Sequence, residues 1–399
     1  MRVSYAATLF HLSFETLERF LSSMRVAIIH PWFLFSGGGE RVTGVLAGMY
    51  PKADVFALFS NDRFLPSELR GRDVRTSFLE WLPGAHRFYR QLMPLHAVGA
   101  ESLDVRGYDL VISSCSSVSK GVLPDQSAVH VSYCHTPTRF LWDYYRPFLR
   151  QRSPLLRPAF AASAHYMRIW DYQAAQRVDQ YAANSYFIAN RIRKYYRRDS
   201  TVIYPPIDTK IGYLERQHDN YYLSVGRLTH TKRIDLLIQA CNRLGRRLVV
   251  AGAGRKMDSL KRMAGPNIEF LGRVDDASLP ELYAKCRAFL FAAEEDLGMV
   301  PLEAQSYGRP VIAFKKGGSL ETVRGYADSA SPTGIFFENQ TVEDVESAIL
   351  QYEQVEGNFA PSQIRAHAVT FDTSVFIHKM SAFINAAMHH GKMPELKCA

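Results

Sequence analysis

Short apolar stretches recur along the chain and alternate with segments in which apolar residues return every three or four positions. Each stretch is a few residues long and apolar on both faces, which is typical of strands buried in a parallel sheet. The stretches span residues 25–30, 108–114, 130–134, 221–225, 247–254, 267–272 and 288–293. The periodic segments predict helices over residues 158–178, 186–196, 231–242, 279–286 and 371–388. This alternation predicts an α/β protein built on parallel sheets.

Two adjacent prolines, Pro205 and Pro206, divide the pattern near the middle of the chain. Residues 201–208 (TVIYPPID) indicate a strand that leaves the first half, and the prolines stiffen the crossing. A length of 399 residues is enough for two domains, each with its own core. We therefore expect one domain over residues 24–205, with residues 371–399 packing back on it, and a second over residues 206–370.

The first 23 residues precede the expected first strand. The chain reads MRVSYAATLF at its start and MRVAIIHPWF from Met24, and only the second resembles the beginning of a parallel-sheet domain. The leader has a short apolar patch and no convincing cleavage site, which argues against a signal peptide. We expect residues 1–23 to be an extension ahead of a natural start at Met24.

The composition, 47 % hydrophobic and 22 % charged, is that of a soluble globular protein. No apolar run approaches the roughly 20 residues of a membrane-spanning helix. The five cysteines show no metal-type spacing, so a reduced cytoplasmic protein is expected.

Positive charge is concentrated in the first half. Residues 24–205 hold 23 Lys and Arg against 14 Asp and Glu, whereas the remaining residues hold 25 of each. Basic residues and aromatics that interleave with them suit an anionic membrane leaflet or a lipid diphosphate, with a solvated face as the alternative. No nucleic-acid-binding motif accompanies them. The candidate residues for an acceptor or membrane are Arg139, Asp143, Arg191, Arg193, Lys194, Arg197 and Arg198.

Two glutamates flank a predicted strand-to-helix loop in the second half. The stretch over residues 294–308 (EEDLGMVPLEAQSYG) follows an apolar strand, and Pro301 is a usual residue for the first turn of a helix. This predicts Glu295 on the loop and Glu303 in the first helical turn. The alternative is that neither glutamate binds a ligand: Glu303 would complement the helix dipole, and Glu295 would be solvated.

The loop between these glutamates offers main-chain donors. Ligands bind beyond the carboxyl ends of parallel strands, and the unpaired N–H groups near Gly298, Met299 and Val300, next to Leu297, suit an anion or hydroxyl groups. Two carboxylates beside such donors indicate a ligand that is both phosphorylated and polyhydroxylated.

Other candidates also follow predicted strands. Arg227 comes after a glycine at a strand end, and Lys232 opens the next predicted helix; a guanidinium fork and a mobile ammonium suit a diphosphate, although Lys232 could equally be an ordinary surface lysine. His135 ends another strand, where a histidine bonded to backbone is the competing interpretation. Gly38 and Gly39 precede a helix, and Arg273 follows the strand over residues 267–272.

Two tempting motifs fail. Gly252 and Gly254 form G-x-G, but Met257 stands where a dinucleotide fingerprint needs its third glycine. Asp275 and Asp276 resemble metal ligands, but they precede a predicted helix that they are better suited to cap.

The segments together resemble retaining, nucleotide-sugar-dependent glycosyltransferases of family 4. Glu295 and Glu303 match the E-x7-E element of that family, and CHTPTRFLWDYY is similar to its GDP-mannose-using members in bacterial surface-polysaccharide assembly. Further family-like segments are residues 224–238, 308–323 and 333–337. The resemblance implies the GT-B fold, in which two doubly wound Rossmann-like domains face a cleft and the C-terminal helix returns to the first.

The resemblance also implies roles. Glu295 and His135 would contact the donor sugar, Arg227 and Lys232 the diphosphate, Glu303 the ribose, and Arg273 the region of the base. Gly38 and Gly39 would lie near the donor phosphates. No metal or other cofactor is expected.

The implied function is the transfer of a sugar, with mannose from GDP-mannose favoured, to a hydroxyl of a glycan or lipid-diphosphate-linked acceptor. The expected place is the cytoplasm or the inner face of the cytoplasmic membrane, without nucleic acid as a partner. A nucleotide-sugar epimerase on the same fold and a catalytically silent nucleotide-sugar-binding subunit are the alternatives.

Overall fold

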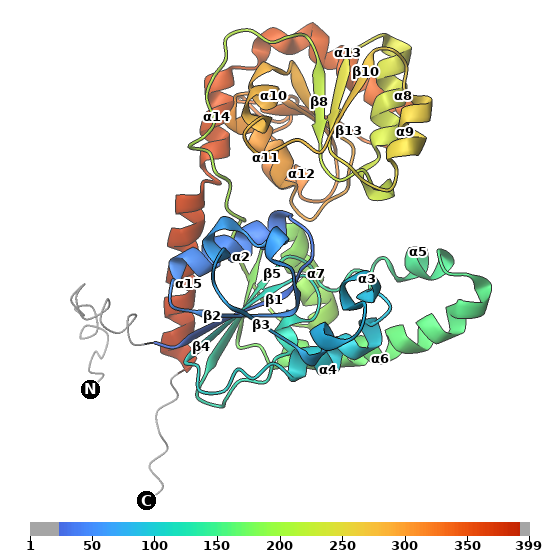
Figure 1. Cartoon of the computed structure of the whole chain (residues 1–399). Coiled ribbons are helices and arrows are strands. Elements are labelled where there is room, and N and C mark those ends of the chain that lie inside the picture. Colours follow the sequence, from blue (N-terminus) through green and yellow to red (C-terminus); the bar gives the residue numbers. More distant parts are fainter. Residues whose placement is uncertain (1–23, 392–399) are drawn as a thin grey trace, which may run out of the picture. The chain divides into compact units, whose positions relative to one another are not determined.

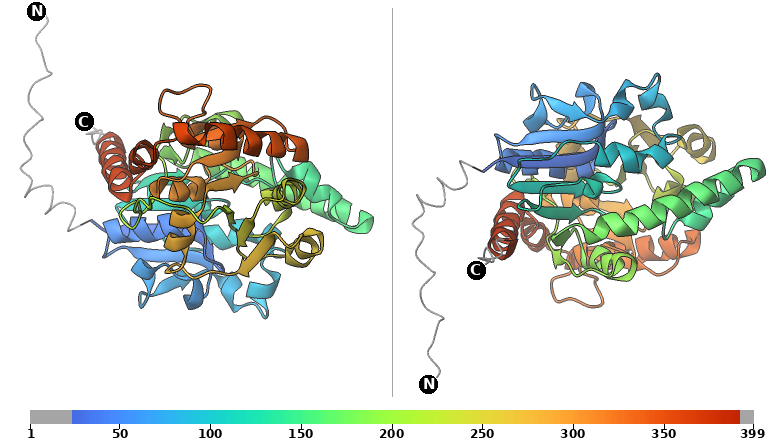
Figure 2. Two further views of the ribbon diagram at one scale, coloured as in Figure 1. Left: turned by 90° about the horizontal axis from the view of Figure 1, so that it is seen from above. Right: turned by 90° about the horizontal axis from the view of Figure 1, so that it is seen from below.

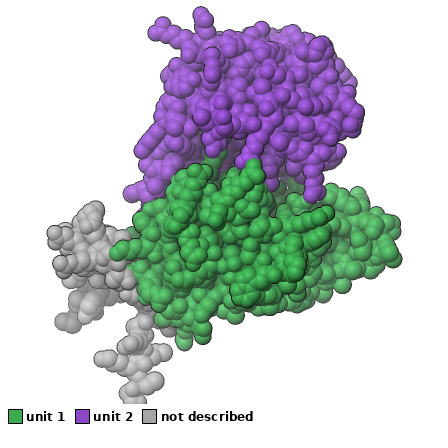
Figure 3. All heavy atoms as spheres, viewed as in Figure 1, with its two compact units in different colours: residues 1–181, 383–399 green, residues 182–382 purple. Residues whose placement is uncertain are grey.

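The structure is a computed structural model that describes residues 24–391, with side chains to residue 389. The expected extension over residues 1–23 lies outside the described residues. The chain forms two compact units (Figure 3). The first comprises the residues up to Tyr181 together with those from Phe383 onward, and the second comprises Ala182–Ala382.

The first sheet has seven strands in the order β3-β2-β1-β4-β5-β6-β7 (Figures 1 and 2). The pairs β1–β2, β1–β4, β2–β3, β4–β5 and β6–β7 are all parallel, as expected for strands linked by helices. The strands are β1 (Val26–Phe33), β2 (Asp54–Ser60), β3 (Val74–Thr76), β4 (Leu110–Cys115), β5 (Val129–Cys134), β6 (Gln180–Ala183) and β7 (Thr201–Val202). The longer helices are α2 (Gly38–Met49), α4 (His96–Glu101), α5 (Tyr145–Arg150), α6 (Arg157–Gln176) and α7 (Tyr186–Tyr196).

The second sheet has six strands in the order β10-β9-β8-β11-β12-β13. The strands are β8 (Tyr222–Val225), β9 (Leu248–Ala251), β10 (Ile268–Gly272), β11 (Ala288–Phe291), β12 (Val311–Phe314) and β13 (Gly334–Phe337). The helices are α8 (Ile234–Leu244), α9 (Met257–Met263), α10 (Leu279–Lys285), α11 (Met299–Ser306), α12 (Ser319–Thr322), α13 (Val342–Val355), α14 (Pro361–Val369) and α15 (Thr373–Gly391).

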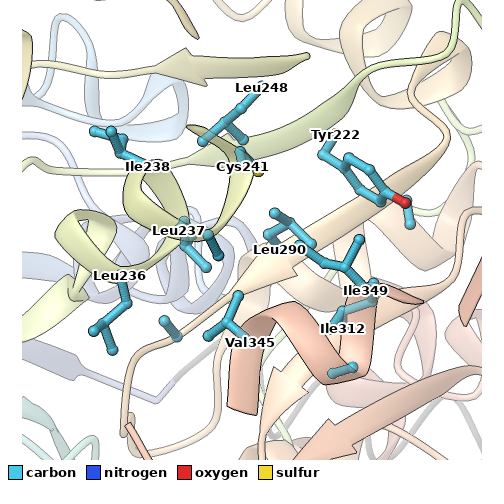
Figure 4. Close-up of a cluster of buried hydrophobic side chains, with 14 of the residues drawn as sticks. Tyr222, Leu236, Leu237, Ile238, Cys241, Leu248, Leu290, Ile312, Val345 and Ile349 are labelled. Atoms are coloured by element: carbon cyan, nitrogen blue, oxygen red, sulfur yellow. The ribbon is translucent and has the colours of Figure 1, made fainter. Parts of the chain in front are cut away.

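The core of the second unit lies where α8 and α13 cover one face of the sheet (Figure 4). Leu237 and Cys241 of α8 are fully buried against Leu248 and Leu290 of the strands, and Ile349 comes from α13. The strands are short and apolar on both faces because both faces of a parallel sheet are covered by helices. This explains why the sequence pattern locates the strands so well.

Both sheets reverse their order at one point. In the first, β1 lies between β2 and β4, and in the second, β8 lies between β9 and β11. These are the topological switch points of doubly wound sheets, where the loops diverge and leave room for a ligand. The predicted fold class of two Rossmann-like domains is confirmed.

Several predicted boundaries differ from the structure. The strand expected over residues 201–208 is only Thr201–Val202, because Pro205 and Pro206 cannot donate to a sheet ladder. The boundary predicted at Pro205 follows the last strand of the first sheet, whereas the division between the two compact units falls earlier, between Tyr181 and Ala182 within β6. The closing helix is α15, and its residues from Phe383 onward group with the first unit.

The G-x-G pair at Gly252 and Gly254 has a structural use. A Cβ atom on Gly252 would lie 1.9 Å from the carbonyl oxygen of Gly226, and one on Gly254 would lie 2.3 Å from that of Leu228. The loops after β8 and β9 thus pass each other at backbone contact distance, which only glycine permits. This approach fixes the loop that carries Arg227 and Lys232.

We therefore expect Gly252→Ala to destabilise the second unit by roughly 2–4 kcal/mol, because the methyl group would collide with backbone at a φ of +144°. Urea unfolding followed by circular dichroism measures the effect. Gly357→Ala is the matched control, since its Cβ would meet nothing within 4 Å, and its change should stay within about 0.5 kcal/mol. Equal effects of the two variants would contradict this account of the loops.

Candidate functional site

A lysine and a glutamate meet at the switch point of the second unit. Lys232 follows β8, Glu295 follows β11, and the Lys232 ammonium forms an ion pair with Oε1 of Glu295. The side chains are 17 % and 24 % exposed, so the pair is partly shielded and yet reachable by a ligand. The structure thus brings together Lys232, predicted to bind the diphosphate, and Glu295, predicted to bind the sugar, although 63 positions separate them.

The sequence predicted that Lys232 opens the helix after β8, but the structure shows that it does not. It ends a 3-10 turn over His230–Lys232, and α8 begins only at Ile234. Arg233 separates the two with a left-handed backbone (φ +50°), which ends the turn. Lys232 consequently sits on a sharp corner, with its ammonium 6.0 Å from the Phe291 ring centroid.

The backbone of the Glu295 loop is held by two glycines. Gly317 forms a parallel bridge with Glu295, and the N–H of Gly318 donates to the Glu295 carbonyl at 2.9 Å. A Cβ on Gly318 would lie 2.1 Å from the Cα of Leu297. The K-K-G-G sequence therefore lets two loops run in contact, so that Glu295 is presented from a braced backbone.

The loop turns into α11 at Gly298, which has a left-handed backbone (φ +84°). No side chain caps this helix, and Met299 and Val300 are its first residues and half-buried, whereas Leu297 is buried. The main-chain N–H groups at this helix N-terminus can therefore donate hydrogen bonds to an anion or to hydroxyl groups.

Glu303 lies one turn further along than predicted. Because α11 begins at Met299, Glu303 is its fifth residue and belongs to the second turn. Its Oε2 accepts a hydrogen bond of 2.8 Å from the Tyr283 hydroxyl. This position distinguishes it from a simple complement to the helix dipole, whose effect is confined to the first turn.

The two remaining predicted donor residues follow strands of the same sheet. Arg227 is exposed directly after Gly226, at the end of β8, and Arg273 is exposed directly after β10. Asp275 accepts a hydrogen bond from the Ser278 N–H at 2.8 Å, so it caps a turn ahead of α10.

Arg191, predicted on the basic surface, is instead buried. Only 7 % of the residue is exposed, and its guanidinium pairs with Asp296 at 3.1 Å. The carbonyl of Asp296 also accepts a hydrogen bond of 2.7 Å from the Ser185 hydroxyl. Arg191 thus anchors the residue after Glu295, while Arg193, Lys194 and Arg197 are exposed and Arg198 is half-buried.

In the first unit, His135 directly follows β5, and its side chain reaches the end of the neighbouring strand β4. Its Nε2 shares a hydrogen bond of 2.8 Å with the Ser114 hydroxyl, which the Thr43 hydroxyl approaches to 2.8 Å. Thr43 in turn lies 2.9 Å from Nδ1 of His30. The histidine is therefore held by side chains as well as by backbone.

The first turn of α2 forms part of this group, because the helix begins at Gly38, whereas the sequence predicted that it follows Gly39. Gly39 lies against both histidines, since a Cβ there would stand 3.6 Å from His30 and 3.7 Å from His135. The buried Glu40 places Oε1 3.5 Å from His30 Nε2. The sequence indicated Gly38, Gly39 and His135 as site residues, but it gave no sign of His30, Thr43, Ser114 and Glu40. The periodicity of β1, β4 and α2 gives no sign that their polar residues converge.

A second buried group holds the loop after His135. The Asp171 carboxylate of α6 receives hydrogen bonds from Lys120 at 2.5 Å, Thr138 at 2.8 Å and Trp142 at 2.8 Å. Burial alone would lower the pKa of Lys120, but the Asp171 carboxylate, together with Cys115 and Cys134, outweighs burial and raises that pKa. Both members of the ion pair are almost wholly buried, so this pair is a structural anchor. Arg139 and Asp143 lie on the same loop, and Asp143 is exposed.

Among residues 24–391, no cluster of three or more His, Cys, Asp and Glu has the arrangement of a metal site. Within the same residues, no helix is both long and apolar enough to cross a bilayer.

Two family profiles match the chain. A profile described as Glycosyltransferase Family 4 matches residues 36–211, and one described as Glycosyl transferases group 1 matches residues 208–365. The chain belongs to glycosyltransferase family 4. The sequence-based prediction of this family, and of an enzyme that transfers glycosyl groups, is confirmed.

Curated relatives are mannosyltransferases among others. The chain is 27 % identical over 382 residues to the alpha-1,3/1,6-mannosyltransferase ALG2 of Saccharomyces cerevisiae, covering 77 % of this chain and 73 % of that protein. It is 24 % identical to ALG2 of Candida glabrata over 44 % of this chain, a match that spans about half (51 %) of the relative. A GDP-mannose-dependent phosphatidylinositol monomannoside mannosyltransferase of Corynebacterium glutamicum is 32 % identical over 31 % of this chain and 35 % of its own length.

Solved structures share the fold. Anabaena HepE in complex with UDP superposes with a TM-score of 0.68 at 17 % identity, over 91 % of this chain and 100 % of that one. Sucrose-phosphate synthase from Thermosynechococcus elongatus gives 0.64 at 15 % identity, over 92 % of this chain and 100 % of that one. At these identities the likeness concerns the fold alone.

We expect His135 to remain neutral at physiological pH. Burial, with a smaller effect of the nearby His30 ring, lowers the pKa of His135 to about 3. The contribution of the neutral ring to the free energy of unfolding is fully present above pH 6.5. As the pH falls from 6.5 toward 3, the free energy of unfolding decreases by up to about 1.4 kcal/mol per pH unit, because the unfolded chain binds a proton that the folded chain does not.

Nuclear magnetic resonance of the histidine rings tests this expectation. The His135 signal, assigned by its loss in His135→Gln, should not shift between pH 8 and 5, whereas free histidine in the same sample should titrate near 6.5. A His135 midpoint near 6.5 would show that the ring is solvated rather than buried.

Proposed function

We propose that the chain transfers a hexosyl group from a nucleotide sugar, with retention of configuration, and that mannose from GDP-mannose is the donor. The observation that carries the proposal is the Lys232–Glu295 pair beside the uncapped N-terminus of α11. The mannosyltransferases among the relatives support the choice of sugar, and the GDP-mannose-dependent one supports the choice of nucleotide.

In this proposal the donor diphosphate takes the place of Glu295 as the partner of Lys232. Arg227, at the end of β8, adds a second positive charge, and the main-chain N–H groups of Met299 and Val300 add hydrogen-bond donors. Such fixed donors stabilise the charge that develops on a leaving diphosphate, and no metal is proposed for this task.

Release from Lys232 leaves the Glu295 carboxylate to accept hydrogen bonds from the sugar hydroxyls and so orient the ring. The bond between the anomeric carbon and the phosphate oxygen breaks while the acceptor oxygen approaches the same face. The acceptor proton passes to the departing phosphate oxygen. Glu303 is proposed to bind the ribose, Arg273 to lie near the base, and His135 to contact the sugar as a neutral hydrogen-bond partner.

The acceptor is proposed to be a hydroxyl of a glycan or a lipid-diphosphate-linked sugar at the inner face of the cytoplasmic membrane. The excess of positive charge in residues 24–205 supports an anionic surface as a partner. Nucleic acid is not proposed as a partner.

A donor panel without acceptor tests the function. We expect slow release of mannose from GDP-mannose and much slower cleavage of UDP-glucose and UDP-N-acetylglucosamine, because the bound diphosphate is activated whether water or an acceptor attacks. Anomeric analysis of the first product should show the configuration of the donor. Conversion to an epimeric nucleotide sugar would establish the epimerase instead, and tight binding without cleavage would establish a silent subunit.

The two glutamates should differ in what they contribute. Glu303→Gln should weaken GDP binding by roughly 1–3 kcal/mol, the value of a charged hydrogen bond, because ribose contacts are alike in ground and transition states. Glu295→Gln should leave GDP affinity unchanged or slightly stronger, since Lys232 no longer has a competing partner, while transfer collapses in kcat.

Calorimetric titration with GDP and UDP, combined with the donor assay, measures both effects. Glu294→Gln is the matched control, because Glu294 precedes Glu295 and pairs with the exposed Lys316 at 3.2 Å. This variant should change neither GDP affinity nor kcat. Loss of GDP binding in Glu295→Gln but not in Glu303→Gln would reverse the assignment.

A further inference from the structure

A helical arm extends from the first unit. It consists of α5, the turn that follows it and most of α6, residues 145–170 in all (Figures 1 and 2). Figure 2 shows α6 running beyond the edge of its own sheet, so that the turn between α5 and α6 lies at the far end of the arm.

The arm carries charge of one sign. Between residues 145 and 170 the sequence contains no Asp or Glu but five arginines: Arg146, Arg150, Arg152, Arg157 and Arg168. The first four of these are exposed. Asp143 precedes the arm and the buried Asp171 follows it, so the four exposed arginines exceed the nearby exposed carboxylates and give the arm a positive potential.

Two leucines are exposed at the tip. All residues from 150 to 159 are exposed, and among them Leu155 and Leu156 are 88 % and 57 % exposed. Further along α6, Tyr166 and Ile169 are 50 % and 56 % exposed. An isolated exposed leucine needs no explanation, but two adjacent ones between Arg152 and Arg157 at the end of a projection indicate contact with another apolar phase.

The tip is preformed rather than loose. Arg157 donates to the carbonyls of Arg150 and Arg152 at 3.3 and 3.2 Å, which closes the turn. Tyr145 stacks on Phe160 with a centroid distance of 6.3 Å, so α5 and α6 are held together. Arg168 donates to the Leu141 carbonyl at 2.8 Å and ties the base of the arm to its own unit.

We propose that this arm docks the enzyme on an anionic lipid bilayer. Leu155 and Leu156 insert at the boundary between headgroups and acyl chains, and Arg146, Arg150 and Arg152 contact lipid phosphates. A narrow, convex tip with two aliphatic side chains suits insertion into a deformable interface, whereas a protein partner would need a much larger complementary area. The rim of arginines matches the negative potential of such a leaflet.

The arm is a better docking surface than the basic end of α7. Arg191 of α7 is buried, and Arg193 has its own acidic partner, Asp199, at 3.6 Å. In α7, Tyr186 is the large apolar residue with marked exposure, 62 %, and it lies at the opposite end from Arg193 and Lys194. Charge and aliphatic exposure therefore coincide on the arm and are separated on α7.

Vesicle sedimentation with the full chain tests the proposal without donor or acceptor, so its outcome is independent of the transfer reaction. The vesicles are phosphatidylcholine with and without phosphatidylglycerol. The wild type should bind the anionic vesicles and be released at high salt. Arg146→Gln with Arg150→Gln should weaken binding about fivefold for each arginine. Leu155→Ser with Leu156→Ser should weaken it about tenfold or more.

Two control variants lie outside the arm. Leu123→Ser removes a leucine that is 47 % exposed in the same unit, and Arg193→Gln with Lys194→Gln removes two charges from α7. Both should bind like the wild type. Unchanged binding in the arm variants, or equal loss in the controls, would overturn the proposal. Light scattering provides the remaining test. If the wild type were a dimer that bound no vesicles, and the double leucine variant were a monomer, the tip would be an interface between two copies of the chain, and the proposal would be wrong.

Discussion

The ion pair between Lys232 and Glu295 is the constraint around which the second unit is arranged. Four loops are needed to form it. The β8 loop carries Lys232, the β9 loop supports it through the backbone contact at Gly252, the β11 loop carries Glu295, and the β12 loop holds that backbone through Gly318. Each contact requires a glycine because backbone meets backbone. Glycines are therefore concentrated where the charged side chains must be fixed.

This pair also poses an energetic problem that the proposed donor would solve. Breaking a partly shielded ion pair leaves two charges to be resolvated, so Lys232 exchanges Glu295 only for a partner of equal or greater negative charge. A diphosphate meets that requirement. A neutral sugar does not, so in the proposed mechanism the phosphates engage Lys232 before the Glu295 carboxylate turns to the sugar.

The sequence predicts the strands and helices better than it predicts the site. Short apolar strands stand out because both faces are buried, and α7 has the predicted bounds because Ser185 caps its start and Arg197 ends it in a left-handed conformation. Arg191 was misplaced because its partner Asp296 is 105 positions away. Glu303 was placed one turn too early because Gly298 delays the start of α11. The His30–Thr43–Ser114 group was missed because residues from three elements converge only in the folded sheet.

Charge is distributed differently in the second unit and in the arm of the first unit. In the second unit two arginines are paired with carboxylates: Arg246 and Arg287 both bind Glu353, at 2.8 and 3.2 Å, and Arg287 also binds Glu356. Hydrogen bonds from Arg246 lower the pKa of Glu353, as expected for a carboxylate fixed beside a cation. The arm has no such carboxylates, yet the same helix, α6, buries Asp171 at its other end to hold the loop after His135. A single helix thus ties that loop to the arm, and any displacement of the arm on a bilayer would act on Thr138 and Trp142 through the one buried carboxylate that binds them.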